Sequence, residues 1–267
     1  MAQPIRIPAG LRIRLRDFDP DDTSLCGDKE HAQESVEKYV RRMAELQQVL
    51  FAEGRHALLI VLQAMDGGGK DGTIRHVAAG LNPQGCRVTG FRAPTPEELS
   101  HDFLWRVHRD VPPLGFIGIF NRSHYEDVLA VRVRRLVSPS VWSGRYGHIN
   151  NFEKLLADGG VTILKFFLHI SKREQKERLE KRLVDPRRAW KFDPVDWENR
   201  RLWKDYMAAY EDAIGRCNTR WAPWHVVPAN KKWYRNLVVS GRTVRALEDM
   251  RLKYPRRRTG RGRSSSE

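Results

Sequence analysis

Short apolar runs alternate along the chain with segments of helical periodicity. The apolar runs predict five strands, at residues 57–63, 86–91, 115–120, 161–168 and 224–228, of which the first and the third are expected to be buried. Around them, apolar residues spaced three and four apart predict amphipathic helices, the first over about 35–52 and the last over about 230–252. Because strands alternate with helices, the pattern predicts an α/β fold, a five-stranded parallel sheet with helices on both faces.

Helix-start sequences refine this pattern. Thr95, Pro96 and Glu98 form a capping box, which begins a helix expected to run to about residue 108. A second box, with Ser and Glu at the ends of 171–174, begins a helix to about residue 183. The Asp-Pro pair at 193–194 begins a long helix that we expect to reach residue 214.

The chain is expected to form one domain over residues 35–253, since no linker or internal repeat divides it. Residues 1–34, with several prolines and an acidic turn, are expected to form an extended arm packed on this domain. The basic residues 254–267 are expected to be a disordered tail.

A glycine-rich loop lies between the first strand and a predicted helix. Its sequence is Ala64-Met65-Asp66-Gly67-Gly68-Gly69-Lys70-Asp71-Gly72-Thr73. Glycines let backbone N–H groups turn toward one point, and the helix N-terminus adds partial positive charge, so the loop is expected to hold a phosphate. It departs from the usual P-loop signature, because Ala64 replaces the first glycine and Asp71 follows the lysine. A plain glycine-rich turn is the alternative, and we expect three consecutive glycines to loosen the loop.

Polar residues follow the third strand, at 121–127. Ligands of an open parallel sheet bind beyond the carboxyl ends of its strands, so this segment and the glycine-rich loop should meet at one rim. Phosphoryl transfer needs positive charge, for which Lys70 and Arg122 are candidates, and carboxylates, for which Asp66 and Asp127 are candidates. Alternatively, Asp127 complements a helix dipole and Arg122 forms a structural ion pair.

A third cluster lies on the helix predicted after the fourth strand. Gln175, Arg178 and Arg182 share one face of this helix, and the following loop adds bases that include Lys191. This arrangement suggests a lid, over about residues 175–200, that closes over phosphates. The alternative is a solvated face on which the interspersed glutamates pair with the bases.

The composition constrains the partners. The 267 residues are 40% hydrophobic and 30% charged, as in globular proteins. The net charge is +15, of which the five arginines and one glutamate of residues 256–267 contribute +4 and the rest of the chain +11. This charge favours a polyanionic partner, although a merely solvated basic surface is the alternative. Since no apolar run is long enough for a membrane span or a signal core, we expect a cytoplasmic protein with no membrane partner, and its three cysteines show no metal or redox spacing.

Several motifs together resemble the polyphosphate kinase 2 family. They occur in the right order over roughly residues 50–240, at 63–73, 120–128, 168–171, 190–192, 222–224 and 228–234. The resemblance implies a P-loop NTPase-like fold related to thymidylate kinase. It also implies an enzyme that moves the terminal phosphate between inorganic polyphosphate and nucleotides with Mg²⁺, or with Mn²⁺, and that assembles as a homodimer or homotetramer.

The resemblance also implies roles for individual residues. Lys70 and the loop amides would hold the transferring phosphate, and Arg122 would stabilise its charge. Asp66 and Asp127 would bind the metal ion and orient the acceptor. The candidate phosphate- and polyphosphate-binding residues are Gly67, Gly68, Gly69, Asp71, Gly72, Thr73, Arg178, Arg182 and Lys191.

One difference from the family bears on the acceptor. Asn121 stands where other branches of the family carry Asp, and the branch with Asn resembles enzymes that accept both nucleoside monophosphates and diphosphates. The neutral amide cannot be a charged metal ligand, which leaves Asp66, Asp127 and Glu126 for that task. Asn121 and Glu126 are the candidates on the nucleotide side, with AMP and ADP, or GMP and GDP, as acceptors.

Two other functions remain open at this point. An ATP-dependent nucleoside monophosphate kinase would share the fold and the loop but would not explain the positive charge. A basic nucleic-acid-binding protein would suit the charge, the eight tryptophans and the Arg- and Gly-rich tail. The aromatic residues are spread through expected core positions instead of alternating with bases on one surface, so we do not expect nucleic acid as a partner.

Overall fold

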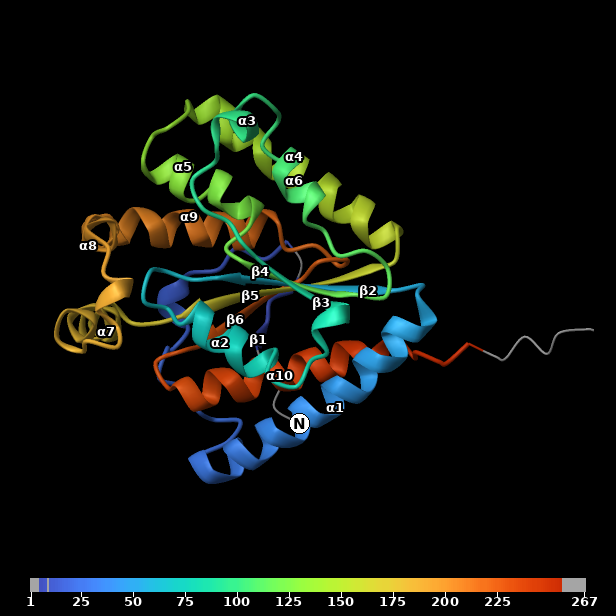
Figure 1. The fold of residues 1–267 in the computed structure, drawn as a ribbon. Helices are drawn as coiled ribbons and strands as arrows, with labels where there is room; N and C mark the ends of the chain where they lie inside the picture. Colours follow the sequence, from blue (N-terminus) through green and yellow to red (C-terminus); the bar gives the residue numbers. More distant parts are fainter. Residues whose placement is uncertain (1–4, 9, 256–267) are drawn as a thin grey trace, which may run out of the picture.

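A six-stranded sheet, with strand order β1-β6-β5-β2-β4-β3, forms the centre of the computed structural model, which describes residues 5–8 and 10–255 (Figure 1). Five of these strands are parallel: β2 (Ala57–Gln63), β3 (Cys86–Gly90), β4 (Ile117–Asn121), β5 (Val161–His169) and β6 (Trp224–Pro228). They confirm the predicted five-stranded parallel sheet.

The N-terminal arm adds a strand that the sequence pattern did not reveal. β1 (Ile5–Arg6) pairs antiparallel with β6 at the edge of the sheet. The Asn218 amide donates to the carbonyls of Ile7 and Pro8, both at 2.8 Å, and so holds the chain that follows. A strand of two residues is too short to show the period-2 alternation by which strands are recognised.

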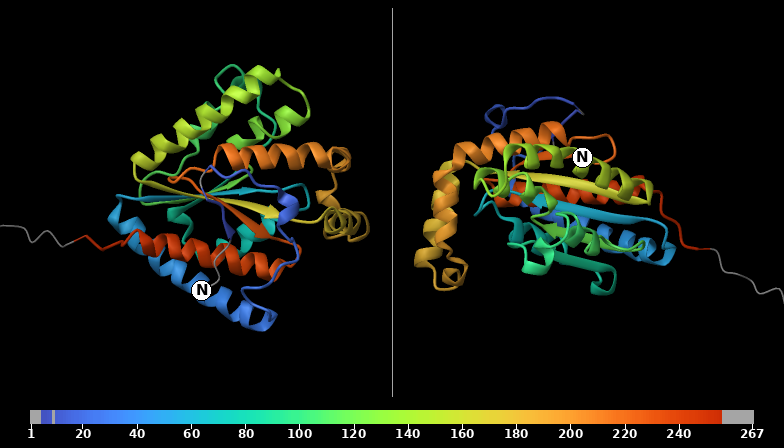
Figure 2. Two further views of the ribbon diagram at one scale, coloured as in Figure 1. Left: turned by 180° about the vertical axis from the view of Figure 1, so that it is seen from behind. Right: turned by 90° about the horizontal axis from the view of Figure 1, so that it is seen from above.

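Helices cover both faces of the sheet. α1 (Lys29–Glu53), α2 (Lys70–Val77) and α10 (Lys232–Asp249) pack on one face, and α5 (Ala130–Val133), α6 (Pro139–Asp158) and α9 (Trp203–Arg216) lie over the other (Figures 1 and 2). Alternate residues of β2 serve the two layers: Leu58, Ile60 and Leu62 join the core with α1 and α10, whereas Leu59 and Val61 join the core with α6 and α9. Residues 57–62 of β2 are all apolar because both faces of the strand are buried.

Four short 3₁₀ helices connect these elements within the described residues. They are η1 (Leu15–Asp17), η2 (Pro83–Gly85), η3 (His124–Asp127) and η4 (Ala189–Lys191).

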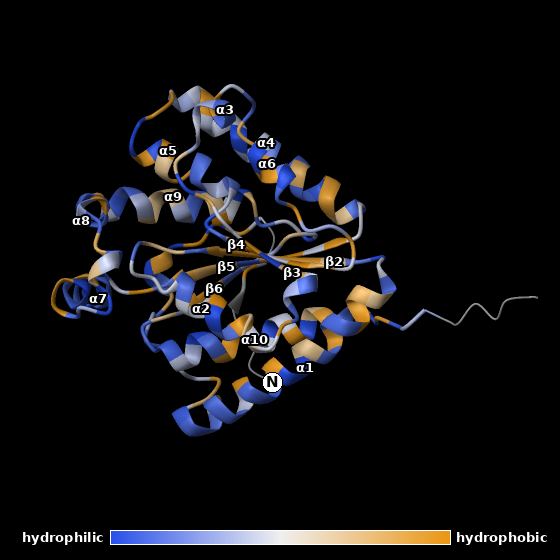
Figure 3. Ribbon diagram, viewed as in Figure 1, coloured by the Kyte–Doolittle hydropathy of each residue, from blue (hydrophilic) through white to orange (hydrophobic). Residues whose placement is uncertain are grey.

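The predicted lid projects beyond the carboxyl ends of the strands (Figure 2). It contains α7 (Lys172–Val184), η4 and α8 (Pro194–Arg201). Figure 3 shows that α7 is mostly hydrophilic, in contrast to the sheet. Only half of the expected capping box forms: Ser171 Oγ accepts from the Glu174 backbone at 3.1 Å, but the Glu174 carboxylate binds Arg178 at 2.7 Å. Polar contacts, more than apolar burial, therefore hold this helix.

Two of the predicted helices are divided in the structure. The segment expected to be helical over 95–108 forms α3 (Pro96–Leu99), with its capping box intact, and a separate α4 (Trp105–Arg109). Asp102 breaks the helix, because its carboxylate accepts from the Leu104 backbone at 2.9 Å and starts a new turn. The long helix expected to reach residue 214 divides at Leu202 into α8 and α9.

Residues 256–267 of the predicted tail lie outside the described residues. Within the described ranges, the helices all lack the combination of length and apolar character that a membrane crossing requires.

Candidate active site

The glycine-rich loop connects β2 to α2, and its glycines are required by its shape. Gly67 and Gly69 have φ angles of +77° and +99°, in the region that side chains disfavour. A Cβ on Gly68 would lie 2.4 Å from the Cβ of Ala64. The close approach of Ala64 to Gly68 and the two positive φ angles therefore each require glycine, so these glycines define the shape of the loop.

Lys70 and Thr73 begin α2 and are both buried. Lys70 is 8% exposed and its Nζ donates to the Ala64 carbonyl at 2.9 Å. Burial, and then the nearby Arg122 cation, lower the pKa of Lys70. The Thr73 hydroxyl donates to the Gly69 carbonyl at 3.1 Å, so in this structure it bonds to the backbone at the start of α2.

Asp66 is the carboxylate at the centre of the loop. Arg122 Nη2 donates to one of its oxygens and the Asn199 amide to the other, both at 2.7 Å. Although burial alone favours the neutral acid, the Lys70 and Arg122 cations hold the pKa of Asp66 below its ordinary value. Asp66 is therefore charged and oriented at neutral pH.

The segment after β4 reaches the same rim, as predicted from the topology. Arg122 follows β4 with a φ of 63°, which is unusual for a residue with a side chain. Besides Asp66 it contacts Glu126 at 3.6 Å, and Glu126 followed by Asp66 raises the pKa of Arg122. The Asn121 amide donates to Asp71 at 2.9 Å. The two segments thus meet through Arg122–Asp66 and Asn121–Asp71.

The structure does not place Asp127 with Asp66 in one cluster. Its carboxylate accepts from Arg145 at 2.9 Å and lies 4.0 Å from Arg106. Burial raises the pKa of Asp127 to about 6, although the two arginines act in the opposite direction. In this structure Asp127 is thus a buried partner of arginines.

The lid residues contact the glycine-rich loop directly. Gln175 donates to the Asp66 carbonyl at 3.0 Å, and Arg178 to the Gly67 carbonyl at 3.0 Å. Arg178 also donates to the carbonyls of residues 229 and 230 and to Glu174, so each of its three nitrogens has a protein partner. Lys191 forms an ion pair with Asp71. The lid helix is therefore docked on the loop.

Two further lid residues were missed in the sequence. Asn199 on α8 is 7% exposed, and its amide oxygen accepts from Arg134 at 2.8 Å and from Tyr206 at 3.0 Å. Asp196, one turn earlier, pairs with Arg182. Burial, and then the Asp66 charge, raise the pKa of Asp196 to about 6. Their three-residue spacing on a predicted helix was the available signal, but nothing in it indicated that α8 turns toward Asp66.

A pocket of about 790 Å³ lies between the loop, the lid and the ends of β3 and β4. Its lining comprises Asp66, Gly67, Gly68, Gly69, Lys70, Asp71, Gly72, Gly90, Phe91, Arg92, Ala93, Asn121, Arg122, Ala130, Arg134, Arg182, Trp190, Lys191, Asp193, Val195, Asp196, Asn199 and Tyr206. Most of the predicted site residues line it, and Arg134 adds a cation that was not predicted.

A second set of cations lies beneath the loop. Arg235 on α10 is 2% exposed, and its Nη1 is so close to the loop that a Cβ on Gly69 would lie 2.0 Å from it. Burial, and then Arg178, lower the pKa of Arg235 to about 10. Burial, and then Arg178, also lower the pKa of Lys232, and burial, and then Arg235, lower the pKa of His76. These groups repel one another, which favours a bound anion beside them.

The residues fit a divalent metal ion at Asp66. Carboxylate oxygens are the ligands that Mg²⁺ prefers, together with water and substrate phosphates. Asp66 and Asp196 both line the pocket, and the charge of Asp66 raises the pKa of Asp196, a repulsion that a cation would relieve. In the described part of the chain, no three His, Cys, Asp or Glu side chains form a complete metal site. Phosphate oxygens would therefore have to supply part of the coordination.

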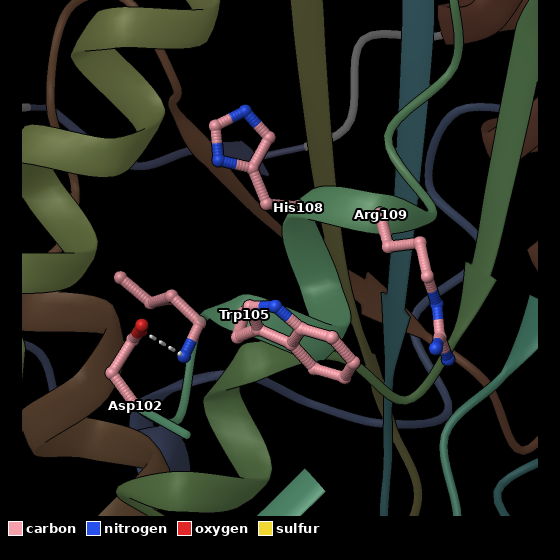
Figure 4. Close-up of a pocket in the computed structure, with 5 residues that line it drawn as sticks. Asp102, Trp105, His108 and Arg109 are labelled. Atoms are coloured by element: carbon pink, nitrogen blue, oxygen red, sulfur yellow. Dashed lines mark hydrogen bonds between the residues drawn. The ribbon is translucent and has the colours of Figure 1, made fainter.

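A separate pocket of about 440 Å³ lies on α4 and the turn that precedes it (Figure 4). It is lined by Asp102, Leu104, Trp105, His108 and Arg109. The Trp105 ring is stacked on His101, 4.1 Å between centroids, and the Arg109 guanidinium lies 5.0 Å from the same ring. This indole already has stacking partners, and none of the predicted site residues lines the pocket.

The family model for polyphosphate kinase 2 matches residues 26–255. The chain belongs to the polyphosphate kinase 2 family. This polyphosphate kinase 2 is 55% identical over 255 residues to the AMP/ADP-polyphosphate phosphotransferase of Meiothermus ruber, covering 95% of this chain and 96% of the relative. It is 42% identical to the ADP-polyphosphate phosphotransferase of Rhodopseudomonas palustris, over 94% of this chain and 91% of the relative.

A solved structure supports the same assignment. The crystal structure of polyphosphate kinase 2 from Arthrobacter aurescens superimposes with a TM-score of 0.90 at 43% identity, covering 97% of this chain and 96% of that one. The family predicted from the motifs is thus confirmed. The departures of the loop from the usual P-loop signature occur here in a member of a kinase family.

Proposed function

We propose that this polyphosphate kinase 2 transfers the terminal phosphate of inorganic polyphosphate to AMP and ADP, reversibly and with Mg²⁺. GMP and GDP are the corresponding guanine acceptors. The observation that carries the proposal is the glycine-rich loop with charge on both sides: Asp66 and Arg122 at its mouth, and Arg235 with Lys232 beneath it. The 55% identical relative named as an AMP/ADP-polyphosphate phosphotransferase supports the choice of substrates.

The residues divide the work of phosphoryl transfer. Lys70, freed from the Ala64 carbonyl, and the loop amides hold the transferring phosphate, and Arg122 stabilises the charge that spreads over its oxygens. Asp66, together with Asp196 on the lid, would hold Mg²⁺, which would supply positive charge to the phosphate oxygens. Asp127 orients the acceptor side through the arginines it contacts.

Donor and acceptor approach from different sides of the loop. The cations on α10 and α2 suit the polyphosphate chain. Burial, and then the charge of Arg178, lower the pKa values of Arg235 and Lys232, and a polyanion beside these cations would oppose both effects. The pocket side with Asn121, Arg92 and Arg134 suits the nucleotide. A kinase that uses ATP as its donor would have no need of the extended cationic side.

The first test feeds the purified protein with AMP, Mg²⁺ and long-chain polyphosphate. We expect ADP and then ATP to form, measured by chromatography. In the control, ATP replaces polyphosphate at the same phosphate concentration, with a trap for contaminating kinases present, and we expect no ADP. Failure to form ADP or ATP from polyphosphate would refute the proposal.

The donor side has its own test. Lys232→Ala should raise the KM for polyphosphate several-fold and leave the KM for AMP unchanged, because Lys232 lies near Arg178 and Arg235 and not in the nucleotide pocket. An equal change in both KM values would contradict the division into two sides.

A further inference from the structure

A buried ionic cluster lies behind the segment that carries Arg122. It joins Lys165 on β5, Glu153 on α6 and Tyr125 on η3, with exposures of 0% for each residue. Lys165 Nζ donates to the Tyr125 hydroxyl at 2.7 Å, to Glu153 at 2.7 Å and to the Cys217 carbonyl at 2.6 Å. The Tyr125 hydroxyl donates in turn to Glu153 at 2.9 Å. The cluster therefore connects β5, α6 and η3 with the segment that contains Cys217.

The stability of the fold does not explain this cluster. A lysine inside a central strand must be stripped of water, and burial lowers the pKa of Lys165 although Glu153 opposes the shift. Buried ion pairs of this kind generally stabilise a protein no better than a well-packed apolar pair of the same volume. An explanation has to come from what the cluster holds in place.

The cluster holds the loop between β4 and η3 from its inner side. His124 and Tyr125 both point inward to Glu153, His124 Nε2 at 3.2 Å. Their neighbours Arg122 and Glu126 contact each other at the rim, where Arg122 binds Asp66. The two inward residues and the two outward residues belong to one short turn.

Arg122 needs such support because its backbone is strained. A φ of 63° is disfavoured for a residue with a side chain, and it persists only where the surroundings impose it. Two contacts impose it here: the Arg122 amide donates to the Leu62 carbonyl at 3.1 Å, and Ser123 Oγ accepts from the Tyr125 amide at 3.2 Å. The second contact depends on where Tyr125 is anchored.

We infer that Tyr125, anchored by Lys165 and Glu153, is a positioning residue for Arg122 in phosphoryl transfer. It does not touch the reacting phosphate. It fixes the turn that aims the Arg122 guanidinium, so the loss of its hydroxyl should affect the chemical step more than substrate binding. The inference rests on the proposed function, since it needs a measurable phosphotransfer from polyphosphate.

The test compares Tyr125→Phe with Tyr234→Phe. Both tyrosines are buried, but in different layers of the core: Tyr125 packs with residues of α6 and α9, whereas Tyr234 packs with residues of α1. With AMP, Mg²⁺ and long-chain polyphosphate, we expect Tyr125→Phe to lower kcat about tenfold, with both KM values within twofold of the wild type. Tyr234→Phe should keep the wild-type kcat, and melting temperatures measured in parallel should fall by similar amounts.

A double-mutant cycle shows whether the effect passes through Arg122. In an Arg122→Lys background, Tyr125→Phe should lower kcat by less than about twofold, because the guanidinium that it positions is gone. A tenfold loss that persists in this background would overturn the inference, as would a wild-type kcat for folded Tyr125→Phe or a change confined to KM.

A second variant removes the anchor and not the tyrosine. The pair Lys165→Met with Glu153→Leu replaces both buried charges by apolar groups, which avoids leaving one charge unpaired. We expect the same loss of kcat as for Tyr125→Phe, and a wild-type kcat in this variant would overturn the inference. If the wild-type protein itself forms no ADP from polyphosphate, the proposed function fails instead.

Discussion

Asp66 and Asp127, the two carboxylates predicted from the sequence to bind the metal ion, lie in opposite environments. Asp66, on the loop after β2, is held by Arg122 and Asn199, and the surrounding cations lower its pKa. Asp127, after β4, is held by Arg145 and Arg106, yet burial raises its pKa to about 6. Residue type alone does not give a carboxylate its role. The balance between lost water and nearby cations sets the direction in which each pKa moves.

The largest effect should follow from Asp66→Asn. The amide removes the negative charge that pairs with Arg122 and that would hold the metal ion, and we expect kcat to fall by about 10³-fold. Steady-state rates with AMP and polyphosphate measure this, with circular dichroism to show that the variant is folded. A folded variant with more than a tenth of the wild-type rate would show that Asp66 is not the metal-side carboxylate.

The raised pKa of Asp127 predicts a pH-dependent stability. Because its folded pKa, about 6, exceeds the ordinary value of 3.8, the folded protein binds this proton more tightly than the unfolded chain does. The resulting stabilisation is complete below about pH 4 and is lost as the pH rises through 6. The free energy of unfolding of the wild type relative to Asp127→Asn should therefore fall by about 2 kcal/mol between pH 4 and 7.

Urea unfolding of the ligand-free protein in EDTA, at several pH values, measures this difference. The remaining titrating groups, Asp196 among them, are common to both proteins and cancel in the comparison. If the free energy of unfolding of the wild type relative to Asp127→Asn instead rises with pH, the arginines outweigh burial. The pKa of Asp127 would then be lowered, like that of Asp66.

Asn199→Ala tests the hydrogen bond between the lid and the Asp66 carboxylate, a contact that Asp127 lacks. Asn199 is the α8 residue that donates to Asp66, and its loss should release the lid and raise the KM for substrate about tenfold. The neighbouring Glu198→Ala provides the control, because Glu198 makes only a long contact with Arg134, at 3.4 Å. Equal effects of the two substitutions would count against a specific role of the Asn199–Asp66 bond.

Asp71→Asn should have the smallest effect. Its side chain is 57% exposed and pairs with Lys191 at the surface, where ion pairs contribute at most about 1 kcal/mol. We expect rates within about threefold of the wild type, and a less steep dependence of the KM on ionic strength. A loss as large as that of Asp66→Asn would place Asp71 among the residues that act on phosphate.

The sequence by itself determined the fold class and the position of the site. The residue pattern specified the five parallel strands, although β3 lies at the edge of the sheet and is partly exposed. β2 is buried on both faces and is apolar over residues 57–62, and the glycine pattern marked the loop after it. Parallel topology then predicted that residues 64–73 and 121–127 meet at one rim, as Arg122 and Asp66 do. These features depend on local periodicity and on backbone geometry.

The tertiary structure decided which side chains meet within that rim. Asn199 on α8 contacts Asp66, and Arg235 on α10 is buried beneath Gly69, and no local sequence pattern encodes either contact. The surroundings of Asp127 were likewise set by Arg106 and Arg145, from α4 and α6. Charge and pKa depend on distances between elements far apart in the chain, and packing alone sets those distances.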